Sequence, residues 1–228
     1  MQKCFNIART TIFFVLLISS IFFLFVVAPI IKILFRKSAP NIFQFFLKSC
    51  SAIIIRGSLV KVNIFGTENL PKEKGIIIAA NHSSFLDNLL LLGMIPVKFR
   101  FVADVSGFRL PFIRQIYRAA SFIETDINRM TFQETAVLYT ALKNKANVAI
   151  YSKLPRKEEV GKFTPTVASF SKATNTPILP VIIKNSAAVL PLKKHILEAN
   201  SVTIIIGQII APENSDTLNE TVNDTYFS

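Results

Sequence analysis

GIIIAANHSSFLD, residues 75–87, joins an apolar run to a short polar stretch, and this junction decides the fold. A continuous apolar run such as GIIIAA, rich in β-branched residues, is typical of a strand that is covered on both faces in a parallel sheet. Ser84 and Asp87 form a capping-box pattern in front of the apolar segment NLLLLGM, which predicts the start of a helix. The stretch therefore predicts a strand, a tight loop and a helix, which together begin an α/β unit.

Strand and helix patterns alternate along the rest of the chain. The strand-like segments are VKVNIFG (60–66), VKFRFVAD, SFIET, NVAIYS, PILPVII and SVTIIIGQII. The helix-like segments between them are PFIRQIYRAA, residues 129–144 and TPTVASFSKATN. This alternation predicts an α/β domain over residues 59–228, with a largely parallel central sheet flanked by helices. The last 17 residues are polar and are expected to end in a short helix or a frayed tail.

Residues 12–31 contain no charged side chain and would extend about 30 Å as a helix, which is enough to cross a bilayer once. A signal peptide is the alternative, because Lys3 and Arg9 supply a basic n-region. The apolar run is longer than the roughly 7–15 residues of a signal-peptide core, however, and no clear cleavage site follows it. We therefore predict an uncleaved hydrophobic membrane helix at about 11–35, within an N-terminal anchor that occupies residues 1–58.

A second hydrophobic helix is predicted at about 40–55, where PNIFQFFLKSCSAIII contains few polar residues. It could be an interfacial or re-entrant helix, and a buried helix of the main domain fits equally well. Together with the first helix it could also form a hairpin that sits in one leaflet without crossing the bilayer. The sequence leaves these arrangements open.

The formal net charge of +12 requires an acidic partner. Membrane lipids with anionic headgroups and a phosphate-bearing substrate both fit this charge. Nucleic acid is not expected, because the basic residues form no binding motif and no aromatic platform accompanies them. The cations that flank the apolar segment are Lys3 and Arg9 before it and Lys32, Arg36, Lys37 and Lys48 after it. The excess after the segment predicts that the rest of the chain lies on the cytoplasmic side of the membrane.

Asn81 and His82 stand where the predicted strand ends, at the carboxyl edge of a parallel sheet, where the sites of α/β proteins gather. Asp87, in the first turn of the next helix, can reach back to one imidazole nitrogen of His82. Such a contact fixes the tautomer and makes the other nitrogen a better base. No Cys or Ser is clearly placed as a nucleophile, so the pair suits removal of a proton from a substrate hydroxyl. The same residues also fit a plain helix start, in which Asp87 only stabilises the first turn.

From about Val60 to Ile210 the chain resembles the glycerolipid acyltransferase family, whose members acylate lysophosphatidic acid or glycerol 3-phosphate. The segments that carry the resemblance are GTENLPKEKGIIIAANHSSFLD with its His-x4-Asp block, VKFRFVADVSGFRLPFIRQIYRAASFIETD, YSKLPRKEEVGKFTPTVASF and PILPVII. The N-terminal hydrophobic helices also resemble the membrane-docking segment of bacterial members. The resemblance implies the same α/β fold and a phospholipid-synthesis activity at the membrane.

On that resemblance, His82 is the general base that removes a proton from an acceptor hydroxyl, and Asp87 orients it. The alkoxide attacks the thioester of acyl-CoA or an acyl-carrier protein, which is a co-substrate, so neither a cofactor nor a metal is expected. The best single acceptor is a lysophospholipid, 1-acyl-glycerol-3-phosphate, which would become phosphatidic acid. The implied substrate-binding residues are Asn81, Ser84, Phe122, Thr125, Arg129, Lys153 and Arg156.

Two blocks depart from the family pattern at positions that hold the acceptor's phosphate and shape its pocket. Thr125 stands at the Arg of the second block, and Lys153 and Leu154 stand at the Glu-Gly pair of the third. Thr cannot replace the planar, bidentate phosphate ligand that Arg provides, although Arg118 and Arg129 nearby could compensate. The alternative function is therefore a catalytically impaired relative that binds lipid or a partner at the membrane. The intact His-x4-Asp block favours an enzyme.

Overall fold

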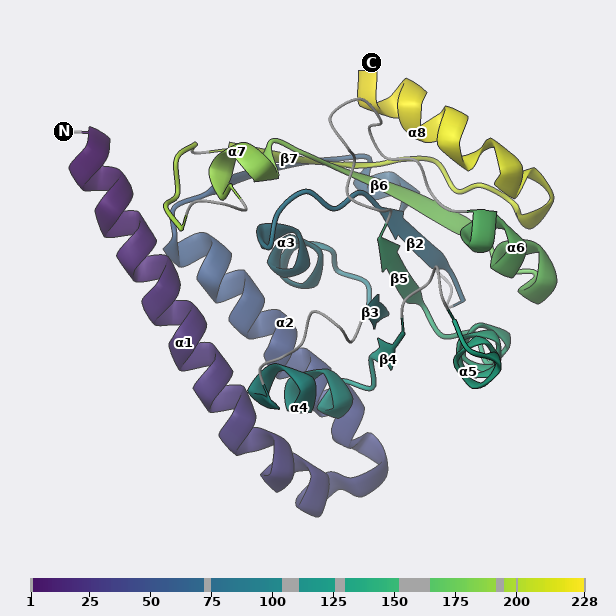
Figure 1. Ribbon diagram of the computed structural model, residues 1–228, viewed down its shortest axis with the longest axis horizontal. Helices are drawn as coiled ribbons and strands as arrows, with labels where there is room; N and C mark the ends of the chain where they lie inside the picture. The colour runs from purple at the N-terminus through teal and green to yellow at the C-terminus, as the bar shows by residue number, and fades with distance from the viewer. Residues whose placement is uncertain are drawn as a thin grey trace.

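The computed structural model describes residues 2–71, 75–103, 111–125, 130–151, 165–191, 195–199 and 201–227 (Figure 1). Within these residues, seven strands form one sheet in the order β1-β7-β6-β2-β5-β3-β4. The strands are β1 (Lys61–Phe65), β2 (Ile77–Ala80), β3 (Arg100–Ala103), β4 (Ile123–Glu124), β5 (Val148–Tyr151), β6 (Ile178–Lys184) and β7 (Ser201–Ile206). All neighbouring pairs are parallel except β6 and β7, which are antiparallel. The largely parallel α/β sheet predicted from the sequence is confirmed.

Helices cover both faces of this sheet (Figure 1). The helices are α1 (Gln2–Phe35), α2 (Ala39–Gly57), α3 (Leu86–Met94), α4 (Pro111–Ala119), α5 (Phe132–Lys143), α6 (Pro165–Thr174), α7 (Ser186–Val189) and α8 (Leu218–Phe227), with short 3-10 turns η1 (Arg36–Ser38), η2 (Thr67–Asn69) and η4 (Pro212–Thr217). Buried side chains of α1, α2, α3 and α4 share one hydrophobic cluster with the sheet. Those of α5, α6 and α8 share the cluster on the opposite face.

The strand β2 shows why both faces must be covered. All four of its residues are completely buried. Ile78 and Ala80 belong to the cluster on the α3 side, whereas Ile77 and Ala79 belong to the cluster on the α5 side. Side chains alternate between the faces of a strand, so a run of consecutive apolar residues has no solvent-facing side.

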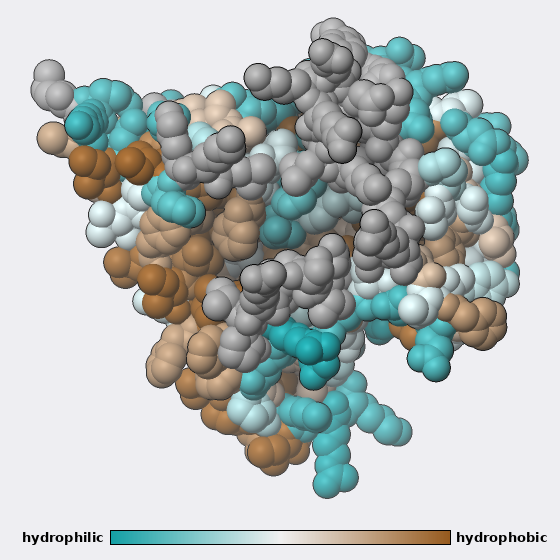
Figure 2. Space-filling model, in the orientation of Figure 1, coloured by the Kyte–Doolittle hydropathy of each residue, from teal (hydrophilic) through white to brown (hydrophobic). Residues whose placement is uncertain are grey.

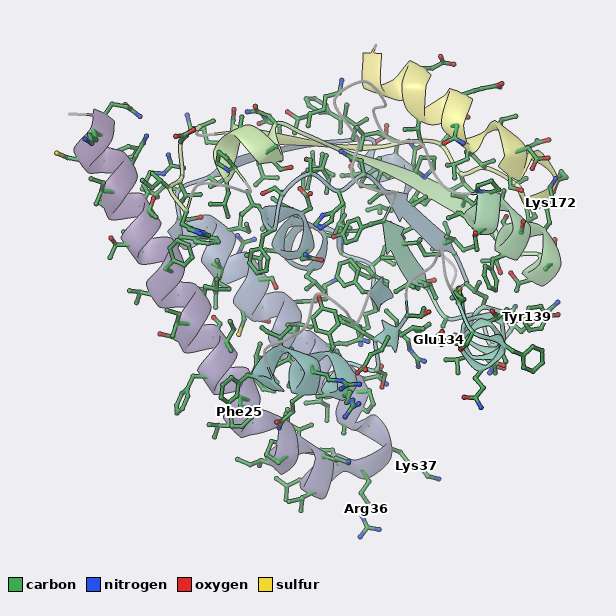
Figure 3. The ribbon with its side chains drawn as sticks, viewed as in Figure 1. Phe25, Arg36, Lys37, Glu134, Tyr139 and Lys172 are labelled. Atoms are coloured by element: carbon green, nitrogen blue, oxygen red, sulfur yellow. The ribbon has the colours of Figure 1, made fainter. Side chains whose placement is uncertain are left out.

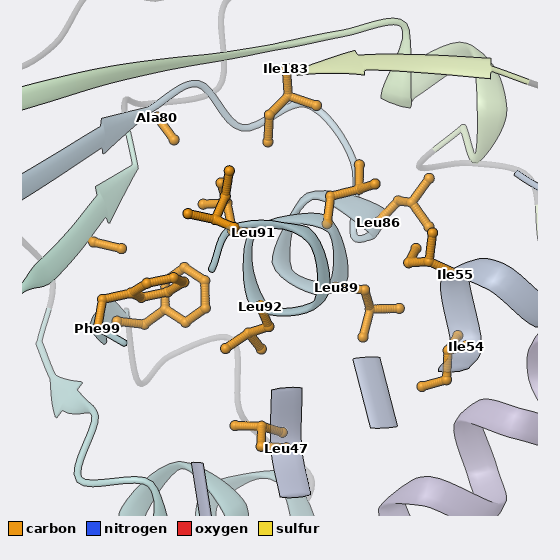
Figure 4. Packing of buried hydrophobic residues seen from close by; sticks show 14 of the residues in the cluster. Leu47, Ile54, Ile55, Ala80, Leu86, Leu89, Leu91, Leu92, Phe99 and Ile183 are labelled. Atoms are coloured by element: carbon orange, nitrogen blue, oxygen red, sulfur yellow. The ribbon is translucent and has the colours of Figure 1, made fainter. Parts of the chain in front are cut away.

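The helix α3 lies between the sheet and α2. Its leucines Leu86, Leu89, Leu91 and Leu92 are buried around most of the helix circumference. Figure 4 shows them between the strand residues Ala80 and Ile183 on one side and Leu47, Ile54 and Ile55 of α2 on the other. The second predicted hydrophobic helix is therefore packed against the α/β domain along its buried face, while its residues Phe45 and Ile53 remain exposed.

Some element boundaries differ from the sequence-based expectations. The first helix was expected from about residue 11, but α1 begins at Gln2, and neither Gly nor Pro interrupts residues 2–11. The last strand was expected to continue through residue 210, but β7 ends at Ile206. Beyond it, Ile210 forms only an isolated antiparallel bridge with Ile178. The short helix expected at the C-terminal end is present as α8.

The helices α1 and α2 form an antiparallel hairpin joined by the turn η1 (Figure 1). By length and composition, the helical segment Gln2–Gly57 is apolar enough to cross a membrane. Near its start, α1 is bound to the α/β domain through the buried side chain of Arg9. Arg9 donates from Nε to the carbonyl of Ser58 at 3.0 Å and from Nη2 to the carbonyl of Ala199 at 3.3 Å. The first turns of α1 are thus tied to the end of α2 and to the segment before β7.

Replacing Arg9 with Met should therefore loosen the hairpin from the domain. Met keeps much of the side-chain volume but leaves both carbonyls without their charged donor, which should lower the free energy of unfolding by about 2 kcal/mol. Thermal unfolding in detergent should then show a midpoint lower by about 4–8 °C. Lys3→Met is the matched control, since Lys3 is an exposed cation on the same helix. Equal midpoints for the two variants would show that Arg9 does not hold the hairpin.

Candidate active site

His82 and Asp87 meet at the carboxyl edge of the sheet, between β2 and α3. His82 Nδ1 lies 3.0 Å from Asp87 Oδ2. The Asp87 side chain is completely buried, whereas the His82 side chain is 28% exposed. The contact expected from the His-x4-Asp spacing is therefore present, and the imidazole is open to solvent on one side. Its catalytic role remains a prediction.

The Asp87 carboxylate is fixed by the backbone as well as by His82. Its Oδ2 also accepts hydrogen bonds from the backbone N–H groups of Ser83 at 2.7 Å and Ser84 at 2.8 Å. Three donors therefore converge on one oxygen at the N-terminal end of α3, where the helix dipole favours a negative charge. With Asp87 ionised, Nδ1 of His82 carries the proton and donates it to Oδ2, which leaves Nε2 as the basic nitrogen.

The predicted capping box is present in altered form. The backbone N–H of Ser84 donates to the Asp87 carboxylate, as that motif requires. The Ser84 hydroxyl, however, accepts from the backbone N–H of Leu86 at 3.2 Å and donates to the carbonyl of Leu190 at 2.8 Å. The Asp87 carboxylate thus serves both the start of the helix and the contact with His82. Because Ser84 is completely buried and its hydroxyl is used inside the protein, its expected role toward a substrate remains untested.

Asn81 connects the end of β2 to β6. Its Nδ2 donates to the carbonyl of Ile183 at 2.9 Å, and its Oδ1 accepts from the N–H of Ile183 at 2.7 Å. The side-chain amide therefore continues the hydrogen bonding between β2 and β6 beyond the last paired residues, Ala80 and Val181. This arrangement fixes the direction in which the chain leaves the sheet, immediately before His82.

Tyr151 is a neighbour of His82 that the sequence analysis did not identify. Its ring stacks on the imidazole with centroids 4.4 Å apart and an interplanar angle of 22°. Tyr151 is the last residue of β5 and is paired in register with Ala80 of β2. Its hydroxyl is buried, and no residue in the described part of the chain forms a hydrogen bond with it. Burial, with a further contribution from the charge of Asp87, raises the pKa of the Tyr151 phenol well above its ordinary value.

Phe122 and Thr125, the substrate-binding residues expected from the second block, stand immediately before and after β4. Phe122 is buried and packs edge-to-face against Phe101 at 5.3 Å and Tyr117 at 5.0 Å, which are contacts of the hydrophobic core; its expected role in substrate binding stays a prediction. Thr125 is also buried, and its hydroxyl has no hydrogen-bond partner among the described residues. Thr125 therefore has no charge that could bind a phosphate. Its hydroxyl also forms no described contact in place of those that an arginine would make.

Cations do lie close to the second block. Glu124, the residue before Thr125, accepts from Nε of Arg114 at 3.2 Å and from Nε of Arg118 at 3.0 Å. Both guanidinium groups belong to α4 and are about half exposed or more. Arg118, expected as a compensating cation, is thus held at the edge of the sheet by Glu124. Arg129, Lys153 and Arg156 lie outside the described residues.

The described residues contain no group of three or more His, Cys, Asp and Glu side chains that could hold a metal ion. The chemistry that this arrangement can perform is proton transfer. His82 has one nitrogen fixed by a buried carboxylate and the other available as a base. This is the arrangement expected of a general base for a hydroxyl-bearing substrate, and that role stays a prediction.

Comparison with known proteins identifies the family of this chain. Residues 61–184 match the model of the Acyltransferase family. The chain belongs to the Acyltransferase family. The matched range runs from β1 to the end of β6 and includes both His82 and Asp87. The resemblance to glycerolipid acyltransferases noted in the sequence is therefore confirmed.

Relatives of this acyltransferase-family protein are identical to it at about a quarter of the aligned positions. A 1-acyl-sn-glycerol-3-phosphate acyltransferase of Borreliella burgdorferi is 25% identical over 146 residues, covering 61% of this chain and 58% of that protein. A chloroplastic 1-acyl-sn-glycerol-3-phosphate acyltransferase of Arabidopsis thaliana is 25% identical over 184 residues, covering 77% of this chain and 51% of that protein. The chain thus spans little more than half the length of these relatives.

The fold also resembles a solved structure. The crystal structure of the 1-acyl-sn-glycerophosphate acyltransferase PlsC from Thermotoga maritima superposes with a TM-score of 0.82 at 19% identity, covering 100% of this chain and 97% of that one. This similarity includes the N-terminal helices as well as the sheet, since the whole chain is covered. It establishes that the acyltransferase-family protein has the same overall fold.

Asn81→Ala should separate a structural role of this residue from substrate binding. Alanine leaves the N–H and the carbonyl of Ile183 without partners, which should lower the free energy of unfolding by about 2–3 kcal/mol. Chemical denaturation measures this loss. Asn63→Ala, at an exposed position of β1, is the control and should change stability little. An Asn81→Ala protein as stable as the parent would favour the expected substrate contact.

Proposed function

We propose that this protein is a membrane-docked O-acyltransferase. It transfers a fatty acyl group from acyl-CoA or an acyl-carrier protein to the hydroxyl of a lysophospholipid, with 1-acyl-glycerol-3-phosphate as the acceptor. The observation that carries the proposal is the His82–Asp87 pair at the carboxyl edge of the sheet, with the carboxylate held by three donors. The names of the relatives from Borreliella and Arabidopsis support the choice of acceptor.

The proposed reaction uses His82 twice. Nε2 of His82 takes the proton from the acceptor hydroxyl while the hydroxyl oxygen attacks the carbonyl carbon of the thioester. The tetrahedral intermediate then collapses, the carbon–sulfur bond breaks, and the thiolate takes the proton from the imidazolium. Asp87 stabilises the imidazolium between these steps, because its ionised carboxylate accepts from Nδ1 throughout. The products are the acylated lipid and the free thiol of the donor.

The acceptor is the part of the proposal that most needs a direct assay. Thr125 removes the phosphate ligand that the family's second block provides, whereas the Arg114 and Arg118 pair supplies two other guanidinium groups beside that block. The panel of acceptors should therefore include lysophosphatidic acid, glycerol 3-phosphate and lysophospholipids with larger headgroups. Each should be tested with acyl-CoA and with acyl-carrier protein as donors.

His82→Ala and Asp87→Asn should both lower acyl transfer. Loss of the base in His82→Ala should reduce kcat by about 10²–10⁴-fold, and Asp87→Asn should have a smaller effect of the same kind. Product formation from labelled acyl donor in vesicles measures both. His195→Ala is the matched control, because His195 is the other histidine and is exposed. Folded parent protein that acylates none of these acceptors would instead favour the catalytically impaired, lipid- or partner-binding alternative.

The exposed apolar face of the helical hairpin supports membrane docking. Figure 2 shows apolar residues gathered over the region where Figure 1 places α1 and α2. The exposed apolar side chains of α1 are Phe5, Ile7, Ile12, Val15, Ile18, Phe22, Phe23, Val26, Ile30, Ile33, Leu34 and Phe35. A continuous strip of this kind is expected to be buried in lipid or in another protein.

The packing of α1 favours docking into one leaflet over crossing the bilayer. Arg9 binds the start of α1 to the domain, and Phe25, farther along α1, packs edge-to-face against Phe112 of α4 at 5.0 Å. At the tip of the hairpin, Arg36 and Lys37 point away from the domain (Figure 3). Charged side chains at the tip would be costly in the hydrocarbon core, whereas they can reach headgroups when the hairpin lies along the surface. We therefore propose that residues 1–58 form the docking unit and residues 59–228 the catalytic domain, on the cytoplasmic side of the membrane.

The double substitution Ile18→Gln with Phe22→Gln should weaken membrane binding. These side chains are 65% and 69% exposed, and making both polar removes apolar surface that lipid would cover. Co-sedimentation with vesicles containing anionic lipid should show binding weaker by on the order of 10-fold or more. Phe132→Gln is the control, because Phe132 is 88% exposed but belongs to α5 on the other side of the sheet. Unchanged co-sedimentation of the double variant would contradict the docking face.

A further inference from the structure

His82 is the end of a stack of three aromatic rings. Its imidazole stacks on the ring of Tyr151 with centroids 4.4 Å apart, and the ring of Tyr151 in turn stacks with Phe101 at 5.4 Å. Both interplanar angles are 22°, so each of the two pairs is stacked and not edge-to-face. Stacked aromatic pairs at such distances attract each other beyond the burial of their surface, so the two contacts favour one orientation of the imidazole.

We propose that Tyr151 is a positioning residue for His82. Its ring, backed by Phe101, fixes the plane of the imidazole, while Asp87 fixes the rotation of the imidazole within that plane. The inference rests on the proposed function, in which His82 is the base, and it adds a residue that acts on this base without touching the substrate.

The sheet determines the stack. Ala80 of β2 and Tyr151 of β5 are register partners in a parallel pair, so His82, two residues after Ala80, emerges next to the end of β5. Phe101 of β3 is the register partner of Ala149, two residues before Tyr151 and therefore on the same face. The three rings thus come from three neighbouring strands: His82 follows β2, Tyr151 ends β5 and Phe101 lies within β3.

The far end of the stack is rigid. Phe101 is almost completely buried, and two other rings pack edge-on against it: Phe99 at 5.1 Å and Phe122 at 5.3 Å. A shift of the Tyr151 ring away from the imidazole would have to displace this packed cluster. Through the stack, the packed core therefore restricts the motion of the His82 side chain, although that side chain is 28% exposed.

Asp87 alone would leave the imidazole partly free. One hydrogen bond at Nδ1 still permits the ring to rock about the line that joins Nδ1 and Oδ2, which would move Nε2 away from the acceptor hydroxyl. The face of the Tyr151 ring blocks this motion on one side. When His82 takes the proton, the same ring face lies against the imidazolium, where its negative π surface favours the positive charge. Both effects act on the chemical step, because small errors in the position of a base cost rate without changing substrate binding.

The Tyr151 hydroxyl permits a clean separation of ring and hydroxyl effects. It is buried without a hydrogen-bond partner in the described part of the chain, and an unpaired buried hydroxyl costs stability. Tyr151→Phe keeps the stack and removes this group, so the ring proposal predicts kcat within about threefold of the parent and equal or higher stability. Burial raises the pKa of the phenol, which keeps the hydroxyl neutral at the pH of the assay.

The kinetic test compares Tyr151→Phe with Tyr151→Leu and with a core control. Tyr151→Leu should lower kcat by about 10-fold or more and leave KM within about threefold. Phe170→Leu is the core control, because Phe170 is a buried ring in the cluster on the opposite face of the sheet; it should lower stability with little change in kcat. If Tyr151→Leu does not fold, Tyr151→Met takes its place. Equal losses of kcat in Tyr151→Phe and Tyr151→Leu would overturn the proposal. So would an unchanged kcat in Tyr151→Leu, or a change in that variant confined to KM.

A spectroscopic test separates this proposal from the proposed activity. The chain has two histidines, His82 and His195, so NMR with selectively labelled histidine gives two imidazole signals. The ring currents of the stack should shift the His82 carbon-bound protons, and this shift should persist in Tyr151→Phe and be lost in Tyr151→Leu, with His195 unchanged in both. A His82 signal that does not respond to Tyr151→Leu would overturn the proposal. The expected shifts in a protein that acylates no acceptor would reject the activity and retain the positioning of His82.

Discussion

The arrangement of the site depends on one buried oxygen, Oδ2 of Asp87. It accepts hydrogen bonds from two backbone N–H groups in the loop and lies 3.0 Å from the imidazole of His82. A buried carboxylate is costly unless its charge is matched by donors, and here the donors are the chain turn that begins α3 and the proposed base itself. The loop, the start of the helix and the orientation of His82 are therefore set together. None of the three could change independently.

The parallel sheet supplies the remaining constraints on this loop. Asn81 pairs its side-chain amide with both backbone groups of Ile183, which fixes the end of β2 against β6. On the opposite side of β2, the end of β5 places Tyr151 against His82. The residue before the loop and the ring beside it are thus held by two different neighbouring strands. A proposed base on a partly exposed loop is in this way positioned by the most rigid part of the molecule.

The hairpin of α1 and α2 belongs to the same packed structure. Gln44 of α2 donates to the carbonyl of Ala120 after α4, and Lys48 donates to the carbonyls of Ile95 and Val97 after α3. Together with the bonds of Arg9, these contacts connect the apolar face of the hairpin to the elements that carry the site. A membrane surface bound by that face would therefore lie at a defined orientation relative to His82. This connection suits an enzyme whose acceptor resides in the bilayer.

The sequence by itself determined the local features of the protein. The strand, loop and helix around GIIIAANHSSFLD, the His82–Asp87 contact and the largely parallel α/β sheet follow from apolar periodicity, from capping chemistry and from spacings of a few residues. Only the tertiary structure decided the strand order, the packing of α2 against α3, the use of the Asn81 amide by Ile183 and the stack of Tyr151 on His82. The physical reason is sequence separation: Asn81 and Ile183 are 102 residues apart, and such contacts form only when the whole sheet brings distant strand ends together. Local patterns contain no information about which distant end becomes the neighbour.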